Sequence, residues 1–199
     1  MTTKIILASG SSIRRKLFEN AGVSVTSMPP KVDEQTIKDS LIHEQAKPRD
    51  IADTLAEYKA RKVSLKNPDS VVIACDQVLD LDGVLFSKPS TQEDAKKILK
   101  KLRGEIHKLH SAAVIYESGK PVWRHVGVAR MSICKISDDY ISDYVVRNWD
   151  EIRHCVGCYQ LEAEGVRLFN KVDGDYFTVL GIPLIEVLSY LSTKGLLQS

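Results

Sequence analysis

The sequence lacks both a membrane-spanning apolar run and a strong imbalance of charge. No uninterrupted apolar segment approaches the roughly 20 residues of a transmembrane helix, and the first residues, Met1 to Leu7, lack the long apolar core of a signal peptide. The 28 basic and 26 acidic residues leave a formal net charge of +2. Composition therefore gives no general case for binding nucleic acid or membranes. We expect a cytoplasmic protein in which any attraction for anions is local.

Cysteine is also scarce, and its spacing excludes the usual cysteine sites. The four cysteines are Cys75, Cys134, Cys155 and Cys158. Cys155 and Cys158 have the CxxC spacing of zinc and redox sites, but no second CxxC or HxxxH pair supplies the remaining zinc ligands. A thioredoxin-type motif follows a strand and opens a helix, whereas this one precedes a glycine-rich region. We therefore expect free thiols.

No internal repeat, linker or low-complexity segment divides the 199 residues. This length fits one domain over residues 1–199, or one domain with a small second lobe around a cleft. Hydrophobic residues make up 43% of the chain, which is enough for a sizeable core. Helical and strand patterns mix along the whole chain, which predicts an α/β or α+β fold.

The most informative stretch runs from Val71 to Pro89. Its β-branched residues predict a buried strand, and Asp82-Gly83 predicts a two-residue hairpin turn, in which both positions need positive φ. Asp76 interrupts the apolar run, where a carboxylate is costly unless it is paired, hydrogen-bonded or bound to a metal. One interpretation is that Asp76 caps a loop or pairs with a nearby Lys or Arg. The other is a site carboxylate, with Lys88 brought back toward it by the hairpin for metal-assisted chemistry on a phosphate ester.

A strand, a small-residue loop and a helix follow one another near the start of the chain. Residues 5–8 predict the strand, residues 9–12 the loop, and Arg14 and Arg15 fall in the first turn of the helix. The N–H groups and the dipole of a helix N-terminus favour an anion there. Two arginines at this place are explained by an anion bound between them, or they are solvated surface residues. The loop lacks GxxxxGK[ST] and is not a P-loop.

Other patterns predict the remaining elements. Alternation over 23–28 predicts a second strand, and helices are expected over about 35–45, 49–66, 138–147 and 184–191, with a further helix after a capping box at 90–93. Strands are expected over about 107–116 and 122–136, and strand-like alternation recurs over 159–162 and 166–172. Asp33 or Glu34 begins the helix at 35 as a cap, or Glu34 supplies a metal ligand. Lys59 lies near a helix C-terminus, where the dipole favours it, or it reaches a phosphate.

Taken in order, several segments resemble the Maf-type nucleotide pyrophosphatases. They are Leu7-Ala8-Ser9-Gly10-Ser11 with Arg14, Val32-Asp33-Glu34, Lys59-Ala60, Ala74-Cys75-Asp76-Gln77, Lys88-Pro89, Val156-Gly157-Cys158-Tyr159-Gln160 and Gly181-Ile182-Pro183-Leu184. Each segment is weak alone, but the ordered set covers nearly the whole chain. The resemblance implies a mixed α/β fold of the inosine-triphosphatase-like kind, with a curved mixed sheet flanked by helices and a central cleft.

The resemblance also implies an activity and a set of roles. It implies hydrolysis of standard or modified nucleoside triphosphates to a monophosphate and pyrophosphate with Mg²⁺ or Mn²⁺, by a cytoplasmic homodimer. Asp76 corresponds to the catalytic carboxylate that activates water or holds the metal, and Glu34 to its acidic partner at the metal. The substrate-binding residues that the resemblance implies are Ser11, Arg14, Lys59, Lys88 and Gln160.

Three positions bear on the choice of base: Ile13, Gln77 and Gln160. The family's commonest loop has an arginine where Ile13 stands, and its thymidine/uridine branch has threonine where Gln77 stands. An apolar residue and a glutamine at these two places are typical of the branch that acts on 7-methyl-GTP, which this sequence resembles more closely. Gln160 departs from the lysine usual in that branch and leaves the favoured base open.

Two other functions are compatible with these residues. A non-catalytic nucleotide-binding regulator of cell division would use the same cations while Asp76 does no chemistry. A nucleic-acid binder would use the basic helix faces at 59–66 and 96–103, which are more simply explained as solvated surfaces. We therefore expect a nucleotide ligand and no nucleic-acid or membrane partner.

Overall fold

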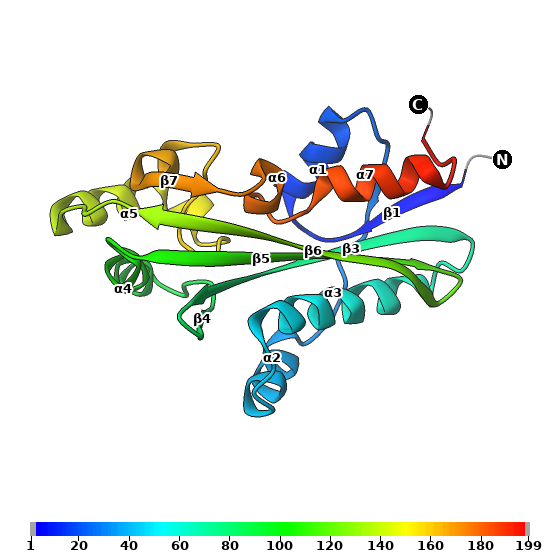
Figure 1. Ribbon diagram of the computed structural model, residues 1–199, viewed down its shortest axis with the longest axis horizontal. Coiled ribbons are helices and arrows are strands. Elements are labelled where there is room, and N and C mark those ends of the chain that lie inside the picture. Colours follow the sequence, from blue (N-terminus) through cyan, green and yellow to red (C-terminus); the bar gives the residue numbers. More distant parts are fainter. Residues whose placement is uncertain (1–2, 198–199) are drawn as a thin grey trace.

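The structure is a computed structural model that describes residues 3–197, in which one long sheet carries helices on both faces (Figure 1). The strands are β1 (Lys4–Ala8), β2 (Thr26–Ser27), β3 (Ser70–Leu81), β4 (Val84–Phe86), β5 (Ile106–Glu117), β6 (Lys120–Ile133) and β7 (Phe169–Asp173). The helices are α1 (Ser12–Asn20), α2 (Glu34–His43), α3 (Pro48–Ser64), α4 (Gln92–Leu102), α5 (Asp138–Ile152), α6 (Tyr176–Val179) and α7 (Leu184–Thr193), with a 3₁₀ helix at Glu164–Leu168.

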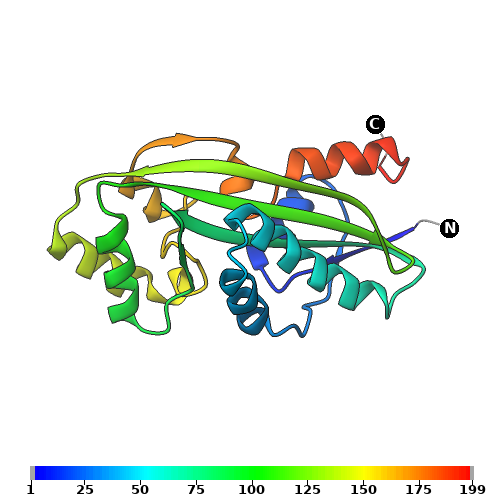
Figure 2. The ribbon, with the colours of Figure 1, turned by 60° about the horizontal axis from the view of Figure 1, so that its bottom comes forward.

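The seven-stranded sheet is mixed, as the sequence predicted. Its order is β2-β1-β3-β5-β6-β7, with β4 paired to β3 outside this path. β1 runs parallel to β2 and β3, whereas the remaining pairings are antiparallel. β3, β5 and β6 form the long spine of the molecule (Figure 2). The expected fold class, a mixed sheet flanked by helices, is confirmed.

One edge of β3 is divided between two strands that do not meet. β1 pairs with residues 70–74 of β3, and β4 pairs with residues 79–81. β5 occupies the opposite edge continuously from 71 to 80. Within the described part of the chain, residues 75–78 therefore have no strand partner on the β1 and β4 side. The sheet opens at this gap, and Asp76 lies in it.

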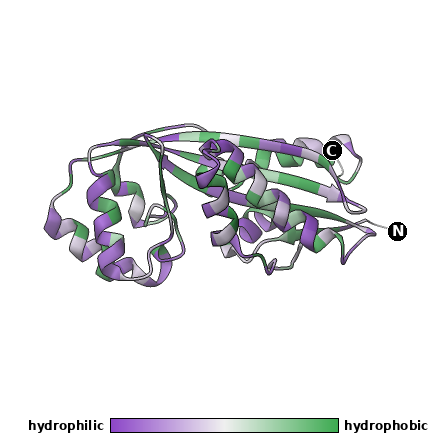
Figure 3. Cartoon of the chain, turned by 90° about the horizontal axis from the view of Figure 1, so that it is seen from below, coloured by the Kyte–Doolittle hydropathy of each residue, from purple (hydrophilic) through white to green (hydrophobic). Residues whose placement is uncertain are grey.

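Alternate residues of the strands face different layers of the core, as the two-residue period of a strand requires. Val72 and Ala74 pack in a cluster with α3. Val71 and Ile73 pack in a second cluster with α1 and α7. A third cluster holds α4 and α5 against the far end of the sheet around Leu79. The outer faces of the helices are largely hydrophilic (Figure 3).

Several local predictions are confirmed. Asp82 and Gly83 both have positive φ, 50° and 87°, as the predicted hairpin turn requires. Ser137 caps α5 by accepting a hydrogen bond from the Tyr140 N–H, and Asp33 caps α2 through the Thr36 N–H. All four cysteines are free thiols.

Other predicted elements were wrong in extent. The strand expected over 23–28 is reduced to Thr26–Ser27, because Val23 turns into the core beneath α1 instead of continuing an edge ladder. The cap of α4 lies one residue later than predicted, since Thr91 accepts from the Asp94 N–H. Asp76 does not interrupt its strand, because the ladder with β5 continues through it.

The later part of the chain differs most from the predictions. α5 continues beyond 147 to Ile152, whose side chain is buried in the third cluster. The alternating segment 159–162 is not a strand, and of 166–172 only the part within β7 is one. The chain folds back so closely here that a Cβ on Gly165 would lie 2.4 Å from the Gln160 carbonyl oxygen. No helix among residues 3–197 is long and apolar enough to cross a membrane.

Candidate functional site

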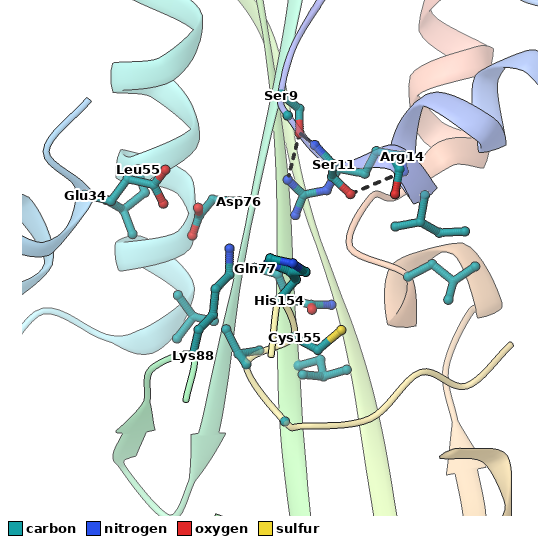
Figure 4. A pocket seen from close by; sticks show the side chains of 18 of the residues that line it. Ser9, Ser11, Arg14, Glu34, Leu55, Asp76, Gln77, Lys88, His154 and Cys155 are labelled. Carbon is teal, nitrogen blue, oxygen red and sulfur yellow. Dashed lines mark hydrogen bonds between the residues drawn. The ribbon is translucent and has the colours of Figure 1, made fainter. Parts of the chain in front are cut away.

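All the residues predicted for the site line one pocket at the gap in the sheet edge, and Figure 4 labels Ser11, Arg14, Glu34, Asp76, Gln77 and Lys88 among them. The full set is Ser11, Ile13, Arg14, Glu34, Lys59, Asp76, Gln77, Lys88 and Gln160. The cavity volume is about 790 Å³, within the range of small-molecule sites. The β1–α1 loop, α2, α3, β3, the β4–α4 connection and the segment after α5 all contribute to its walls.

At the centre of the pocket a buried ammonium lies between two carboxylates. The Lys59 Nζ is 2.5 Å from Asp76 Oδ1 and 2.9 Å from Glu34 Oε2. The side chains of Lys59 and Asp76 are only 8% and 9% exposed, whereas Glu34 is 48% exposed. Burial raises the pKa of Asp76 above its usual range, while the Lys59 ammonium and its hydrogen bond oppose this shift. Asp76 is therefore both ion-paired and in the pocket, so the two interpretations of this residue do not exclude each other.

Lys59 is not explained by the helix dipole alone. It lies on the buried face of α3, which packs along β3 and brings its ammonium to the strand gap. A buried lysine of this kind needs a carboxylate partner, because an unpaired charge in the interior is costly. The proximity of α3 to the middle of β3 thus decides the position of this cation.

Lys88 lines the same pocket as Asp76, toward which the hairpin was expected to bring it, and the described residues hold no ion pair between the two. The Lys88 side chain points into the pocket (Figure 4). No carboxylate lies within 4 Å of its ammonium in the described residues. It is close enough to Cys155 to oppose the effect of burial, which raises the pKa of that thiol to about 11. Lys88 thus offers an uncompensated positive charge to a ligand.

Arg14 fills the gap in the sheet edge. Ser11 caps α1 by accepting from the Arg14 N–H. The Arg14 Nη1 donates to the Cys75 carbonyl at 2.9 Å, one of the groups on β3 without a strand partner on this side. Gly181, with φ of 96°, leaves room for the guanidinium, because a Cβ there would lie 2.9 Å from Arg14 Nη2. The Gly181-Ile182-Pro183 segment is therefore part of the support of this arginine.

The prediction that an anion is held between Arg14 and Arg15 is wrong. Arg15 lies 3.6 Å from Glu19 in an exposed i,i+4 pair on α1 and does not line the pocket. Only Arg14 points toward the pocket, because consecutive residues of a helix project in different directions.

The orientation of Gln77 is fixed by the scaffold behind it. Its Nε2 donates to the Ser111 hydroxyl at 2.9 Å and lies 3.0 Å from the Val179 carbonyl. A carbonyl oxygen only accepts hydrogen bonds, so the amide nitrogen must face α6 and β5. The carbonyl oxygen is the group that Gln77 has left to offer a ligand.

Gln160 is held at the pocket rim by the segment that precedes it. The Tyr159 hydroxyl is hydrogen-bonded to His107 Nε2 at 2.6 Å, and the Tyr159 ring packs edge-on against Phe169. A Cβ on Gly157 would lie 2.3 Å from the Tyr159 ring. Burial lowers the pKa of His107 to about 4, so this histidine is neutral near pH 7. The packing of the Val156–Gln160 segment thus fixes the position of Gln160 at the pocket rim.

The polar residues of the pocket that the sequence arguments missed include Ser9, Lys38 and His154. Ser9 Oγ accepts from the Ser11 N–H at 3.2 Å. Lys38 lies four residues after Glu34 on α2, so the i,i+4 spacing would have placed both on one helix face. His154 follows α5 and carried no local signal, because its role depends on where that helix ends.

The fold and the site together define a class: a mixed α/β protein whose sheet edge opens onto a pocket with paired carboxylates and several cations. The family described as Maf-like protein matches residues 4–194, and the chain belongs to that family. The resemblance identified from the sequence segments is therefore confirmed.

Curated relatives match over nearly their full length. The nucleoside triphosphate pyrophosphatase of Roseobacter denitrificans is 60% identical over 98% of each chain, and that of Ruegeria pomeroyi is 56% identical over 100% of each. The 7-methyl-GTP pyrophosphatase of Brucella abortus is 43% identical over 96% of each chain. Among solved structures, a HAM1 protein from Coxiella burnetii is 18% identical, covering 67% of this chain and 74% of that chain with a TM-score of 0.44.

Proposed function

We propose that this protein hydrolyses nucleoside triphosphates to a nucleoside monophosphate and pyrophosphate. The observation that carries the proposal is the buried Asp76–Lys59 pair in a pocket that also holds Arg14 and Lys88. In the described part of the chain neither Arg14 nor Lys88 has a carboxylate within 4 Å. The printed activities of the full-length relatives support the same reaction.

The chain's own groups account for binding and proton transfer. Arg14, Lys59 and Lys88 bind the phosphate oxygens and stabilise the negative charge that develops on the leaving pyrophosphate. The Ser11 side chain and the N–H groups at the start of α1 contribute further donors. Asp76 accepts the proton of the attacking water, and its raised pKa brings it closer to the range of an efficient general base.

Asp76 and Glu34 are the residues that fit a divalent cation, Mg²⁺ or Mn²⁺. One oxygen of each lies within 3 Å of the Lys59 Nζ, so the two carboxylates meet at one place in the pocket. The residues described contain no group of three or more His, Cys, Asp or Glu side chains that would form a complete protein cage. Two carboxylates suit Mg²⁺, which is usually held by one or two carboxylates together with substrate phosphates. When bound, the cation would neutralise phosphate charge.

We further propose that the base is a modified purine of the 7-methylguanine type, selected by Ile13, Gln77 and Gln160. The fixed Gln77 carbonyl is an acceptor for the N–H groups that guanine presents on its pairing edge. Glu151 and Glu162 also line the pocket, and both are close enough to raise the pKa of Cys155. Their negative charge suits a base that methylation makes cationic.

The test is a panel of standard and modified nucleoside triphosphates incubated with the purified protein and Mg²⁺ or Mn²⁺. We expect pyrophosphate release from at least one of them, and a higher kcat/KM for 7-methyl-GTP than for GTP, dTTP or UTP. No release from any nucleotide would contradict the proposed reaction. Tight binding by calorimetry without turnover would instead support a regulator that binds nucleotides without hydrolysing them.

We also propose that the protein is a cytoplasmic homodimer with no nucleic-acid or membrane partner. The near balance of 28 basic and 26 acidic residues supports the absence of a polyanionic partner. Light scattering coupled to size-exclusion chromatography measures the mass of the assembly, and the mass of a single 22.2 kDa chain at micromolar concentration would contradict the dimer.

A further inference from the structure

Lys38 joins two walls of the pocket that are far apart in the sequence. It lies on α2, and its Nζ donates to the Phe86 carbonyl at 3.0 Å and to the Ser87 hydroxyl at 3.1 Å. Both acceptors lie just before Lys88, which like Arg14 is a pocket cation without a carboxylate within 4 Å among residues 3–197. α2 thereby holds the end of β4 through a single ammonium.

The environment of this ammonium favours a positioning role. Burial lowers the pKa of Lys38, while Asp76 and Asp39 oppose that shift. No carboxylate lies within 4 Å of Lys38 in the described residues, and its hydrogen-bond partners are a carbonyl and a hydroxyl. Hydrogen bonds from a charged donor are stronger than neutral ones. A partly buried lysine held by neutral acceptors therefore fixes a backbone segment without cancelling its own charge.

The segment it fixes has little other support. β4 is three residues long and pairs with β3 only through Val84, Leu85 and Phe86. Ser87 and Lys88 lie beyond that ladder and before α4. The direction in which Lys88 enters the pocket is thus set by a short connection, and the contacts of Lys38 fall at its beginning.

We propose that Lys38 is a positioning residue for phosphate binding, which holds residues 86–88 so that Lys88 points at the triphosphate. The expected effect on kcat/KM rests on the proposed function, whereas the expected effect on the order of residues 86–88 does not. Lys38 acts through Lys88, so removal of both lysines should cost no more than removal of Lys88 alone.

The first experiment needs no substrate. Hydrogen exchange of the backbone over residues 84–90 should be faster in Lys38→Met than in the unaltered protein, and unchanged in Lys101→Met, an exposed lysine of α4 outside the pocket. Ser87→Ala, which removes one acceptor from the opposite side, should show a smaller increase at the same place. Exchange over 84–90 that is the same in all variants would overturn the proposal. This readout remains decisive even if no nucleotide is hydrolysed.

The second experiment is a double-mutant cycle on pyrophosphate release. Lys38→Met should lower kcat/KM on the order of tenfold, the size expected for one hydrogen bond of a charged donor, mainly through a higher KM. In the Lys88→Met background the same substitution should have no further effect, and Lys38→Arg should recover part of the loss. Additive effects of the two substitutions would overturn the proposal, because Lys38 would then act on the substrate by itself.

Discussion

At the scale of the residue, the site depends on one buried ion pair whose partners come from a strand and a helix. The fold tolerates the buried Asp76 carboxylate in β3 because the Lys59 ammonium compensates its charge. Such a pair adds little net stability, since the loss of solvation offsets most of the attraction. Its presence in the middle of a sheet is therefore better explained by function than by folding.

Asp76→Asn should abolish most activity while the fold is kept. Loss of a general base typically costs 10²- to 10⁴-fold in rate, and Asn has nearly the same shape. The measurement is steady-state pyrophosphate release, with circular dichroism to check the fold. The matched control is Asp80→Asn, another buried aspartate on the same strand and face that does not line the pocket. If Asp76→Asn remains as active as the control, Asp76 is not the base.

Lys59→Met should shift the pH dependence of the reaction. The Lys59 ammonium lowers the pKa of Asp76 against the effect of burial, so its removal raises that pKa further. A general base works in its deprotonated form, so activity falls as the pH drops through the pKa of Asp76. The acid limb of the kcat/KM profile should therefore lie at higher pH in the variant. An acid limb in the same place would show that a different group controls it.

The predicted residues all line the pocket, but other lining residues were missed and the pairing of the charged groups was not predicted. Ser11, Arg14 and Lys88 follow strand ends, and Asp76 interrupts an apolar run, which are local signals. The pairing of Lys59 with Asp76 and Glu34 was not predictable, because it depends on how α3 packs against β3. The tethering of Gln77 to the Val179 carbonyl joins residues about a hundred positions apart, and no local pattern contains that information.

At the scale of the element, the segment between α5 and the 3₁₀ helix shows how packing overrides a local pattern. Its alternation suggested a strand, but Tyr159 is anchored to His107 and the chain returns on itself at Gly165. Strand propensity is weak compared with such tertiary contacts. The long elements β3, β5, β6 and α3 were predicted well, because their apolar periodicity extends over many residues.

Gly157→Ala should impair nucleotide binding at the pocket rim more than it lowers the stability of the fold. The added Cβ would lie 2.3 Å from the Tyr159 ring, so the ring must move and Gln160 with it. We expect a loss of stability of about 1–3 kcal/mol, typical of overpacking, and a higher KM for the nucleotide. Urea unfolding and steady-state kinetics measure the two effects. The control Gly195→Ala strains a backbone with φ of 67° outside the pocket, where the added Cβ has no atom within 4 Å. It should therefore cost stability without moving Gln160, and an equal KM in both variants would contradict this role.

At the scale of the whole molecule, three apolar clusters share the same long strands. β3 contributes side chains to all three clusters. We propose that residues 1–199 form one domain that unfolds in a single cooperative transition, because β3 links all three clusters.

Stability should fall in acid through the buried His107. Its pKa is about 4 in the folded protein, against an ordinary value near 6.5, so the unfolded chain binds a proton first as the pH drops. The stabilisation is therefore complete above about pH 6.5 and is lost progressively toward pH 4, by up to about 3 kcal/mol. Urea unfolding between pH 8 and pH 4 measures this loss. His107→Gln should show a smaller acid loss than His43→Gln, which changes an exposed histidine at the end of α2; equal losses would contradict the assignment.

The gap between β1 and β4 on the edge of β3 has a consequence for how the base preference of the pocket can change between relatives. The cations that we propose bind phosphate come from residues before position 90, whereas Gln160, Glu151 and Glu162 come from residues after position 150. β5 and β6 lie between these two groups in the sequence, although both groups line one pocket, so residues 151–162 can be exchanged without altering the residues before position 90. Transplanting residues 151–162 from a relative with another preferred base should then shift the preference only in part, because Ile13 and Gln77 stay in place, and should leave the bond that is cleaved unchanged.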